Sequence, residues 1–433
     1  MTRMKESGID WIGQIPQEWE VKDIKHIFEE IGSGATPKSD NETFYDGDIN
    51  WIQSGDLYQT EKVIKVSKTI TYQGFQSTSA LKIYKHPFIA LAMYGASVGN
   101  VAISCIDACV NQAVVVMLGT SEKVRFGKYA IEASKNNLIF SAQGGTQPNI
   151  SQILIKNWNI PQPDSSEQTK IADFLDKKTA QLDKVKGLLE EQIQKLKDYR
   201  ASLIYETVTK GLDKTVPMKD SGINWIGQVP QGWGVKRLKY LVNKIGSGKT
   251  PLGGSEIFEE TGILFIRSQN VHNGLIQLED KSTYINRNIH RQMIGTSVEK
   301  NDILLNITGA SIGRVAKYDL DVEANVNQHV CIIRCDRFVL PDYLMYFIMS
   351  EFGQFMIKIH QISGNREGLS FDNIGNFKII IPDLDYQYKI SQYLNKKMLI
   401  INQMIKTKDQ QIENINKQRQ TLIYDYVTGK RRV

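Results

Sequence analysis

A segment near the start of the chain recurs almost unchanged in its second half. Residues 4–19 read MKESGIDWIGQIPQEW and residues 218–233 read MKDSGINWIGQVPQGW, so the two agree at 12 of 16 positions with an offset of 218 − 4 = 214 residues. This offset is far longer than the roughly 20–50 residues of a solenoid or propeller repeat. The chain is therefore predicted to contain two versions of one whole domain.

The duplication extends over almost the entire chain. Shared motifs follow one another in the same order, at offsets that drift by only a few residues. At an offset of 214 they are IGSGATP (31–37) with IGSGKTP (245–251), and GASVG (95–99) with GASIG (309–313). The others are VNQ (110–112 and 326–328), an Ile-Pro step (160–161 and 381–382) and Leu-Ile-Tyr (203–205 and 422–424). Insertions this small between the copies belong in surface loops.

The first part of each copy, about 160 residues, is rich in short apolar runs and turn signals. Runs of strand length that are enriched in β-branched residues occur at 49–52, 101–103, 110–118, 263–266 and 303–307. Helical stretches are expected at 126–140 and 341–360. Each copy is therefore predicted to begin with a mixed α/β (α+β) globular domain.

The second part of each copy is predicted to be a long helix. Residues 167–210 contain no proline, and an apolar stripe with heptad spacing runs along both copies, interrupted in the second by Lys408. The stripe residues, which we expect to pair helices or dock partners, are Leu175, Leu182, Leu189, Leu196 and Leu203, then Leu394, Ile401, Ile405, Ile412, Ile415 and Leu422.

A one-sided helix needs a partner for its apolar face. Each helix could fold back on its own globular domain, or the two could pair with each other. Pairing is favoured because two matched stripes on one chain meet at high effective concentration. An antiparallel pair would turn the tandem duplication into a pseudo-two-fold object. The predicted architecture is two homologous globular domains (1–163 and 213–384) separated by two helical regions (164–212 and 385–433) that form an antiparallel coiled coil.

Composition restricts the class of protein without defining it. The 433 residues carry a net charge of +6 with a pI near 8.8, which permits a polyanionic partner. The start MTRMKESG lacks the apolar core of a signal peptide, and no apolar stretch of 18 residues occurs, so we expect a cytoplasmic protein with no membrane contact. The four cysteines are read as buried thiols rather than metal ligands: Cys105, Cys109, Cys331 and Cys335.

Motifs that resemble catalytic sites are incomplete. The segment GSGKT (246–250) resembles the end of a phosphate-binding loop, but Asn243 stands where the first glycine is required, and Ala35 replaces the lysine in the first copy. No adenine-methyltransferase tetrapeptide, nucleophile elbow or HExxH motif is present. The six histidines occupy unrelated places in the two copies. We therefore expect a binding protein without catalytic residues.

The two copies differ most in short loops between retained flanks. IQSGDL (52–57) becomes IRSQNV (266–271), and GTQPNIS (145–151) becomes GNREGLS (364–370). Arg, Asn, Gln and Asp are the side chains that read base edges, although such residues could also be solvated loop positions free to drift. The candidates for DNA contact in the first copy are Lys38, Gln53, Ser54, Asp56, Tyr58, Tyr94, Ser97, Thr146, Gln147 and Asn149. Those in the second copy are Arg267, Ser268, Gln269, Asn270, Ser311, Arg314, Asn365 and Arg366.

The order of these motifs resembles the specificity subunit of type I restriction-modification systems. The resemblance rests on GIxWIGxxPxxW, GSGxTP, GASxG and VNQ, then Ile-Pro-x-Pro and Glu167-Gln168 before the heptad helix, and it covers essentially the whole chain twice. The second copy departs slightly, with Tyr386-Gln387 in place of Glu-Gln and Tyr393 in place of phenylalanine.

This resemblance implies a role in DNA recognition. Each globular half would be a target recognition domain for one part of a bipartite double-stranded DNA site, and the helices would dock two methyltransferase subunits. Those partners would carry S-adenosylmethionine, and restriction subunits would use ATP and Mg²⁺. Two other classes stay open: a coiled-coil adaptor for protein ligands, and an enzyme that uses the GSGKT turn.

Overall fold

The computed structural model describes residues 3–142, 149–251, 253–278, 283–362 and 368–433. These residues form two compact units. Unit 1 comprises Met1–Leu189 with Asp409–Val433, and unit 2 comprises Glu190–Lys408. Each unit therefore contains one of the duplicated globular parts together with a portion of both long helices.

Unit 1 is built on two sheets. A five-stranded sheet has the order β4-β11-β8-β9-β6, and a three-stranded sheet has the order β10-β5-β7. The strands of the larger sheet are β4 (Glu30–Ser33), β6 (Lys62–Val63), β8 (Phe88–Ala92), β9 (Val101–Ser104) and β11 (Val114–Leu118). Those of the smaller sheet are β5 (Tyr45–Ile52), β7 (Thr69–Ile70) and β10 (Cys109–Val110).

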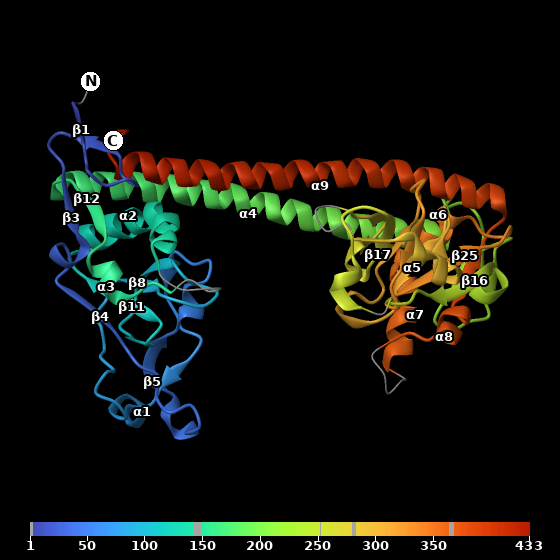
Figure 1. Cartoon of the computed structure of the whole chain (residues 1–433), viewed down its shortest axis with the longest axis horizontal. Helices are drawn as coiled ribbons and strands as arrows, with labels where there is room; N and C mark the ends of the chain where they lie inside the picture. The colour runs from blue at the N-terminus through green and yellow to red at the C-terminus, as the bar shows by residue number, and fades with distance from the viewer. Residues whose placement is uncertain (1–2, 143–148, 252, 279–282, 363–367) are drawn as a thin grey trace. The chain divides into compact units, whose positions relative to one another are not determined.

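The larger sheet of unit 1 is covered on both faces because its central strands are apolar throughout. Ile89 and Leu91 of β8 face the helix α2 (Ser121–Phe140), which lies beside β8 and β11 in Figure 1. Phe88 and Ala90 alternate with them and pack with residues of the smaller sheet such as Ile52. Smaller elements complete the unit: β1 (Met4–Glu6) with β2 (Gln14–Pro16), β3 (Glu20–Asp23) with β12 (Asn159–Gln162), α1 (Tyr72–Gln76) and α3 (Gln152–Lys156).

Unit 2 repeats this plan. Its two main sheets have the orders β16-β25-β22-β23 and β20-β17-β24-β21. Their strands are β16 (Val242–Ser247), β17 (Ile263–Ile266), β20 (Tyr284–Ile285), β21 (Ser297–Val298), β22 (Ile303–Asn306), β23 (Val315–Lys317), β24 (Ala324–Val326) and β25 (Val330–Cys335). The remaining elements are β13 (Met218–Asp220), β14 (Gln228–Pro230), β15 (Gly234–Arg237), β18 (Val271–His272), β19 (Leu275–Ile276), β26 (Lys378–Ile381), α5 (Arg287–Gln292), α6 (Pro341–Met349), α7 (Glu351–Ile362) and α8 (Phe371–Gly375).

Two predicted segments are divided in the structure. The apolar run 110–118 forms the end of β10 and then β11, because the chain turns at residues 111–113 between them. The expected helix at 341–360 is two helices, α6 and α7, which meet at Ser350. Its hydroxyl donates to the carbonyl of Phe347 (2.6 Å) and accepts from the amide of Gly353 (3.3 Å), so it ends one helix and begins the next.

The long helices are α4 (Ser165–Lys210) and α9 (Leu384–Val427), and they pair antiparallel within each unit. In unit 1 the rings of Phe174 and Tyr426 lie 4.4 Å apart, and Arg419 Nε lies 3.6 Å from the Asp183 carboxylate. In unit 2 Lys408 donates to Gln192 (2.5 Å) and Arg200 donates to Asn402 (3.2 Å). Residue numbers rise on one helix as they fall on the other. The antiparallel pairing is therefore confirmed, and none of the stripe residues predicted for it is exposed.

The ends of the helices also complete the globular cores. Ile423 and Val427 of α9 are buried in the core of unit 1, and Ile204 and Val208 of α4 are buried in the core of unit 2. Each core therefore includes a helix end that comes from the other copy of the duplication. Both options for the apolar stripe hold at once, since the helices pair with each other and each also packs on its own globular part, α4 through Leu175 and α9 through Leu394.

The repeated opening segment has a structural role at these helix ends. Gly429 has a φ of +70°, and a Cβ there would lie 2.4 Å from Cδ of Pro16 and 3.2 Å from Trp19. Gly211 has a φ of +78°, and a Cβ there would lie 3.2 Å from Trp233. Each of these two positions therefore requires glycine for two reasons: the backbone is left-handed, and a neighbouring tryptophan or proline leaves no room for a Cβ. The tryptophan of each Pro-x-x-Trp motif packs on the end of the other copy's helix.

The start of each helix corrects one pairing of the sequence motifs. Gln168 Nε2 donates to the carbonyl of Pro163, and Gln387 Nε2 donates to the carbonyl of Pro382, both at 2.9 Å and with an offset of 387 − 168 = 219. The proline equivalent to Pro382 is therefore Pro163, and not Pro161 as the Ile-Pro steps indicated. The two prolines are equivalent because the carbonyl of each accepts a hydrogen bond from the buried glutamine in the first turn of the following helix.

The cysteines are only partly as expected. All four are free thiols; Cys109 and Cys331 are buried, but Cys105 is exposed, so its assignment as a buried thiol was wrong. Within the described ranges, no group of three or more His, Cys, Asp or Glu side chains is arranged to hold a metal ion. No helix in that part of the chain is long and apolar enough to cross a membrane.

Candidate nucleic-acid interface

The repeated motifs of unit 1 meet at one edge of its sheets. At the carboxyl ends of their strands, Ser33 of β4 pairs with Val115, and Ala92 of β8 pairs with Val114. Ile52, the last residue of β5, pairs in parallel with Val110. The segments that follow these strands therefore emerge together. We call residues 34–38, 53–60, 93–100, 111–113 and 149 the loop edge of unit 1.

Unit 2 has the same arrangement. Ser247 of β16 pairs with Cys331, Asn306 of β22 pairs with Val330, and Ile266 of β17 pairs in parallel with Val326. The loop edge of unit 2 consists of residues 248–251, 267–270, 307–314, 327–329 and 368. The divergent loops IQSGDL and IRSQNV therefore begin at equivalent places, the ends of β5 and β17, whereas most of the divergent loops 145–151 and 364–370 lies outside the described residues.

The glycine-rich turn at each loop edge is explained by close packing. A Cβ on Gly34 would lie 1.8 Å from the carbonyl oxygen of Val110, and a Cβ on Gly248 would lie 1.7 Å from that of Val326. The Thr36 hydroxyl then donates to Gln112 (2.5 Å), and Thr250 donates to Gln328 in the same way. The GSGxTP and VNQ motifs recur together because the first crosses directly over the second. This contact accounts for Gly34 and Gly248 without a bound phosphate.

Two of the candidate contact residues anchor their own loops. The Asp56 carboxylate accepts from the amides of Gln53 (2.8 Å) and Ser67 (3.0 Å). The buried side chain of Asn270 accepts from the amide of Arg267 (2.9 Å) and donates to the carbonyl of Gln277 (2.9 Å). These two equivalent residues therefore shape the 3₁₀ turns Ser54–Leu57 and Ser268–Asn270, and their direct contact with DNA stays a prediction.

The other candidates divide by exposure. Lys38, Tyr58, Asn149, Gln269 and Arg314 are exposed. Gln53, Ser54, Tyr94, Arg267, Ser268 and Ser311 are half-buried, while Ser97 is buried. Thr146, Gln147, Asn365 and Arg366 lie outside the described residues.

Gln53 shows that the loop edge of unit 1 is not self-sufficient in hydrogen bonds. Its Nε2 is shielded from solvent and has no partner among the described residues. Such groups are rare in folded proteins, since leaving a buried donor unpaired costs about 1–3 kcal/mol. Arg267 occupies the equivalent position in unit 2, directly after β17. Both loop edges therefore place a long side chain with amide or guanidinium donors at the same point.

The sequence matches the family described as type I restriction modification DNA specificity domain twice, over residues 16–195 and 230–414. The chain belongs to the type I restriction-modification specificity family. The two matches correspond to the two copies of the duplication, so the resemblance inferred from the motifs is confirmed.

Individual relatives agree with this assignment. The MjaIX specificity subunit of a type I restriction enzyme from Methanocaldococcus jannaschii is 24% identical, in an alignment that covers 100% of this chain and 97% of the relative. The EcoBI specificity subunit from Escherichia coli is 25% identical, with 86% and 79% covered. A solved structure from a study of complex assembly in the type I R-M system shares the fold, with a TM-score of 0.68 at 14% identity over 95% of this chain and 98% of that one.

Sequence reasoning missed the residues that connect the loops of a specificity subunit to one another. Buried Asn306 donates through Nδ2 to the carbonyl of Ser268 (2.8 Å) and to the hydroxyl of Ser311 (3.1 Å), so it ties two segments of the unit 2 loop edge together. The first copy has Ala92 at this position, since 306 − 214 = 92. The difference was visible in the sequence, but Asn306 stands in the apolar run of a strand and not in a divergent loop.

A buried ion cluster in unit 1 was missed as well. Lys128 and Glu132 of α2 pair at 2.8 Å, and Arg419 of α9 pairs with both Glu132 and Glu61. Lys128 also pairs with Glu61, which follows the 53–60 loop. Burial raises the pKa of the Glu132 carboxyl, but the charges of Lys128 and Arg419 outweigh burial and hold that pKa below its ordinary value. The cluster joins the paired helices to the loop edge.

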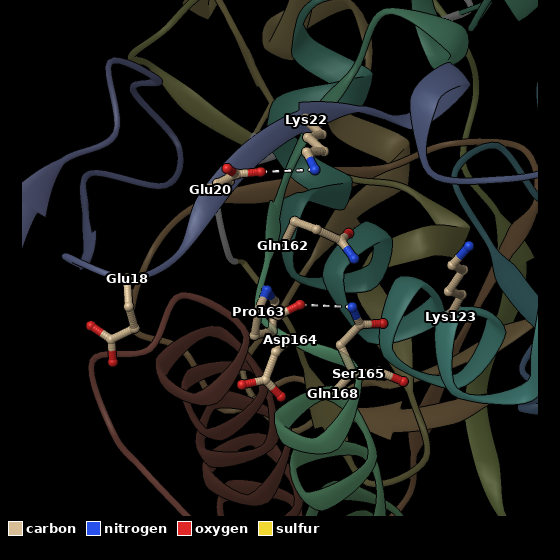
Figure 2. A pocket seen from close by; sticks show the side chains of 9 residues that line it. All are labelled: Glu18, Glu20, Lys22, Lys123, Gln162, Pro163, Asp164, Ser165 and Gln168. Carbon is tan, nitrogen blue, oxygen red and sulfur yellow. Dashed lines mark hydrogen bonds and ion pairs between the residues drawn. The ribbon is translucent and has the colours of Figure 1, made fainter.

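A cavity of about 360 Å³ lies elsewhere in unit 1. Figure 2 shows that its lining side chains come from β3 and Glu18 before it, from α2, from the end of β12, and from the first turn of α4 with the two residues before it. The Lys22–Glu20 ion pair and the bond from Gln168 to Pro163 lie in its wall. None of the candidate DNA contacts that lie in the described ranges lines this cavity. It belongs to the junction between helix and sheet and not to the loop edge.

Proposed function

We propose that this chain is the DNA-reading subunit of a type I restriction-modification complex, and that each loop edge reads one half of a bipartite site. One observation carries the proposal. In both units the retained motifs build the same frame, and the polar side chains that differ between the copies stand in the loops that this frame presents. A device with a fixed frame and variable donors is suited to reading two different sequences.

The side chains at the loop edges have the chemistry that base recognition needs. Arg267 can donate two parallel hydrogen bonds to guanine, and an amide such as Gln53 can both donate to and accept from adenine. Exposed Lys38 and Arg314 can neutralise phosphates, which adds affinity without sequence preference. Base identity would therefore depend on a few half-buried residues, and general affinity on the exposed cations around them.

The paired helices would set the distance between the half-sites and dock two methyltransferase subunits. Catalysis would reside in those partners, with S-adenosylmethionine on the methyltransferase and with ATP and Mg²⁺ on restriction subunits that act on cytoplasmic DNA. The membership of the chain in the specificity family and the self-pairing of α4 and α9 support this division of labour. Absence of DNA binding in the assembled complex would instead favour a protein adaptor.

Replacing Arg267 with alanine is expected to relax one base pair of the second half-site, at a cost of roughly 1–3 kcal/mol in discrimination. The first half-site should be unchanged, because it is read by unit 1. Mapping of methylated adenines in DNA modified by the complex gives both half-sites at once. Arg287→Ala, an exposed arginine on α5 away from the loop edge, is the matched control. An unaltered motif in Arg267→Ala would show that this arginine does not read DNA.

Replacing Lys38 with alanine is expected to weaken binding to all DNA sequences by a similar factor. The logarithm of the binding constant should also depend less steeply on the logarithm of salt concentration, by about one unit, since one phosphate contact is lost. Titrations of the complex with specific and nonspecific duplexes at several salt concentrations measure both effects. Lys5→Ala, on β1, should leave the slope unchanged. A change of sequence preference in Lys38→Ala would contradict a phosphate contact.

Replacing Leu189 with proline is expected to break α4 locally, at a cost of about 3 kcal/mol or more. If the paired helices fix the spacing of the half-sites, the complex should lose methylation of the bipartite motif. Leu189→Met keeps the apolar stripe and should preserve methylation. The same genome-wide methylation map reports on both variants. An intact motif with unchanged spacing in Leu189→Pro would show that the paired helices do not fix the spacing of the half-sites.

A further inference from the structure

One chain of hydrogen bonds in unit 2 runs through the middle of its loop edge. Thr250 donates to Oε1 of Gln328, and Nε2 of Gln328 lies 3.0 Å from Nε2 of His329. The other ring nitrogen of His329, Nδ1, lies 2.5 Å from the hydroxyl of Thr308. The chain therefore connects the GSGKT turn, the residue after VNQ and the residue before the GAS turn.

The amide of Gln328 gives this chain a direction. Because its Oε1 accepts from Thr250, its Nε2 donates to Nε2 of His329, and that ring nitrogen must carry no proton. Nδ1 of a neutral His329 then carries the proton and donates to the oxygen of Thr308. Among the residues that the structure describes, none accepts the hydroxyl hydrogen of Thr308. This hydroxyl is thus held as an oriented donor.

The equivalent place in unit 1 is filled in the opposite way. The offsets 308 − 94 = 214 and 329 − 113 = 216 make Tyr94 the counterpart of Thr308, and Ala113 the counterpart of His329. The backbone is the same, since the amides of Met93 and Ile307 donate to the carbonyls of Ala113 (2.8 Å) and His329 (3.0 Å). Each loop edge therefore has one ring at this point. In unit 1 it is Tyr94, which follows β8, and in unit 2 it is His329, which precedes β25. Exchange of a small and a large residue in both partners indicates a retained site with altered chemistry.

We propose that Thr308 contacts a base of the second half-site and that His329 is the residue that positions it. This inference rests on the proposed function. The Thr308 hydroxyl would donate to an acceptor on the major-groove edge, a purine N7 or a carbonyl oxygen. His329 holds that hydroxyl in place through Nδ1, and Gln328 and Thr250 hold His329. In unit 1 the Thr36–Gln112 bond persists, but Ala113 follows it in place of a histidine, and the hydroxyl of Tyr94 would take the role of the Thr308 hydroxyl.

The site of Thr308 agrees with this assignment. Thr308 is half-buried and forms an antiparallel bridge with Gly368. The amide of Leu369 donates to the carbonyl of Ile307 (2.9 Å), which fixes the backbone on both sides. Asn306, two residues earlier, ties the Arg267 loop to the GAS turn. The oxygen of Thr308 therefore stands among the segments that form the unit 2 loop edge, on a backbone that leaves it little freedom.

The test uses the full chain assembled with its methyltransferase partner, and duplexes in which each base pair of the methylated motif is varied in turn. Thr308→Val removes the hydroxyl and keeps the shape, and His329→Leu removes the donor to Thr308. Both are expected to lower discrimination at the same single base pair of the second half-site by about tenfold. His329→Asn, which retains a donor near the place of Nδ1, and Thr308→Ser, which retains the hydroxyl, should keep most of that discrimination.

The possible outcomes separate this inference from the proposed function. Unchanged discrimination in both Thr308→Val and His329→Leu, with bipartite methylation intact, would overturn the inference and leave the function standing. An equal loss at every base pair, or no rescue by His329→Asn, would show that the pair only supports the fold and would also overturn it. A wild-type complex without any sequence-specific methylation would instead refute the function on which the inference rests.

Discussion

Substitution of Arg419 by methionine is expected to destabilise unit 1 by about 3–5 kcal/mol, the usual cost of removing one partner from a buried ion cluster. Glu132 would remain buried beside Lys128 with its second cation gone, and Glu61 would lose the bond that ties it to α9. Hydrogen exchange of the full chain, read at α2 and β9, measures the loss within unit 1 separately from unit 2. Denaturation with urea gives the total effect.

The second copy of the duplication provides a control substitution for Arg419→Met. Arg200 is the counterpart of Arg419, since 419 − 200 = 219, but among the described residues it bonds only to neutral Asn402, at 3.2 Å. Arg200→Met should therefore cost only about 1 kcal/mol. Equal effects of the two substitutions would contradict the importance of the cluster.

The positions of Lys128 and Glu132 correspond to methionines in unit 2. Tyr129 bonds to Asp176 and Tyr346 to Asn395, both at 2.7 Å, which sets the offset at 346 − 129 = 217 and identifies Met345 and Met349 as the counterparts. A triple change of Lys128, Glu132 and Arg419 to methionine should restore much of the stability lost in Arg419→Met, because no buried charge is then left unpaired and the Glu61 carboxylate, which is 45% exposed, can be hydrated. Failure of this rescue would show that the arginine acts through packing and not through charge.

The features that the sequence predicted are those with a local or periodic signal. The heptad stripes identified α4 and α9, and the β-branched run 263–266 matched β17. The copy-to-copy comparison separated the framework from the loops IQSGDL and IRSQNV, which the structure then places at the ends of β5 and β17, because polar exchanges are tolerated where strands end. Repetition was informative since each motif could be checked twice against the same framework.

Features that depend on long-range packing had no such signal. Lys128 and Glu132, spaced one turn apart, look like an ordinary solvated helix face, and nothing nearby in the sequence shows that Arg419 covers them. The burial of Ile204 and Ile423 in the core of the other copy depends on where the paired helices end. Likewise, Asp56 and Asn270 resemble base readers by residue type, and only their hydrogen bonds show that they hold their own loops.

Substitution of Gly248 by alanine is expected to destabilise unit 2 by about 3 kcal/mol and to abolish sequence-specific binding of the second half-site. The new Cβ would lie 1.7 Å from the carbonyl oxygen of Val326 and 2.7 Å from that of Asn327, both backbone atoms held by β24 and the turn after it. Either the GSGKT turn must lift away from VNQ, breaking the Thr250–Gln328 bond, or β24 must shift. Urea denaturation and binding to half-site duplexes measure the two consequences.

Two other substitutions in the GSGKT segment serve as controls for Gly248→Ala. Gly246→Ala meets nothing within 4 Å and should change stability by less than about 0.5 kcal/mol. Lys249→Ala removes the side chain that a phosphate-binding loop would use, and it should leave both the fold and the methylated motif intact, with at most a lower affinity for all DNA. If Gly248→Ala behaved like Gly246→Ala, the crossing of GSGxTP over VNQ would not be the reason that the motifs recur together. If Lys249→Ala instead abolished binding of a nucleotide, the turn would be a phosphate site. The close approach of its backbone to Val326 would then not be the reason for the GSGKT sequence.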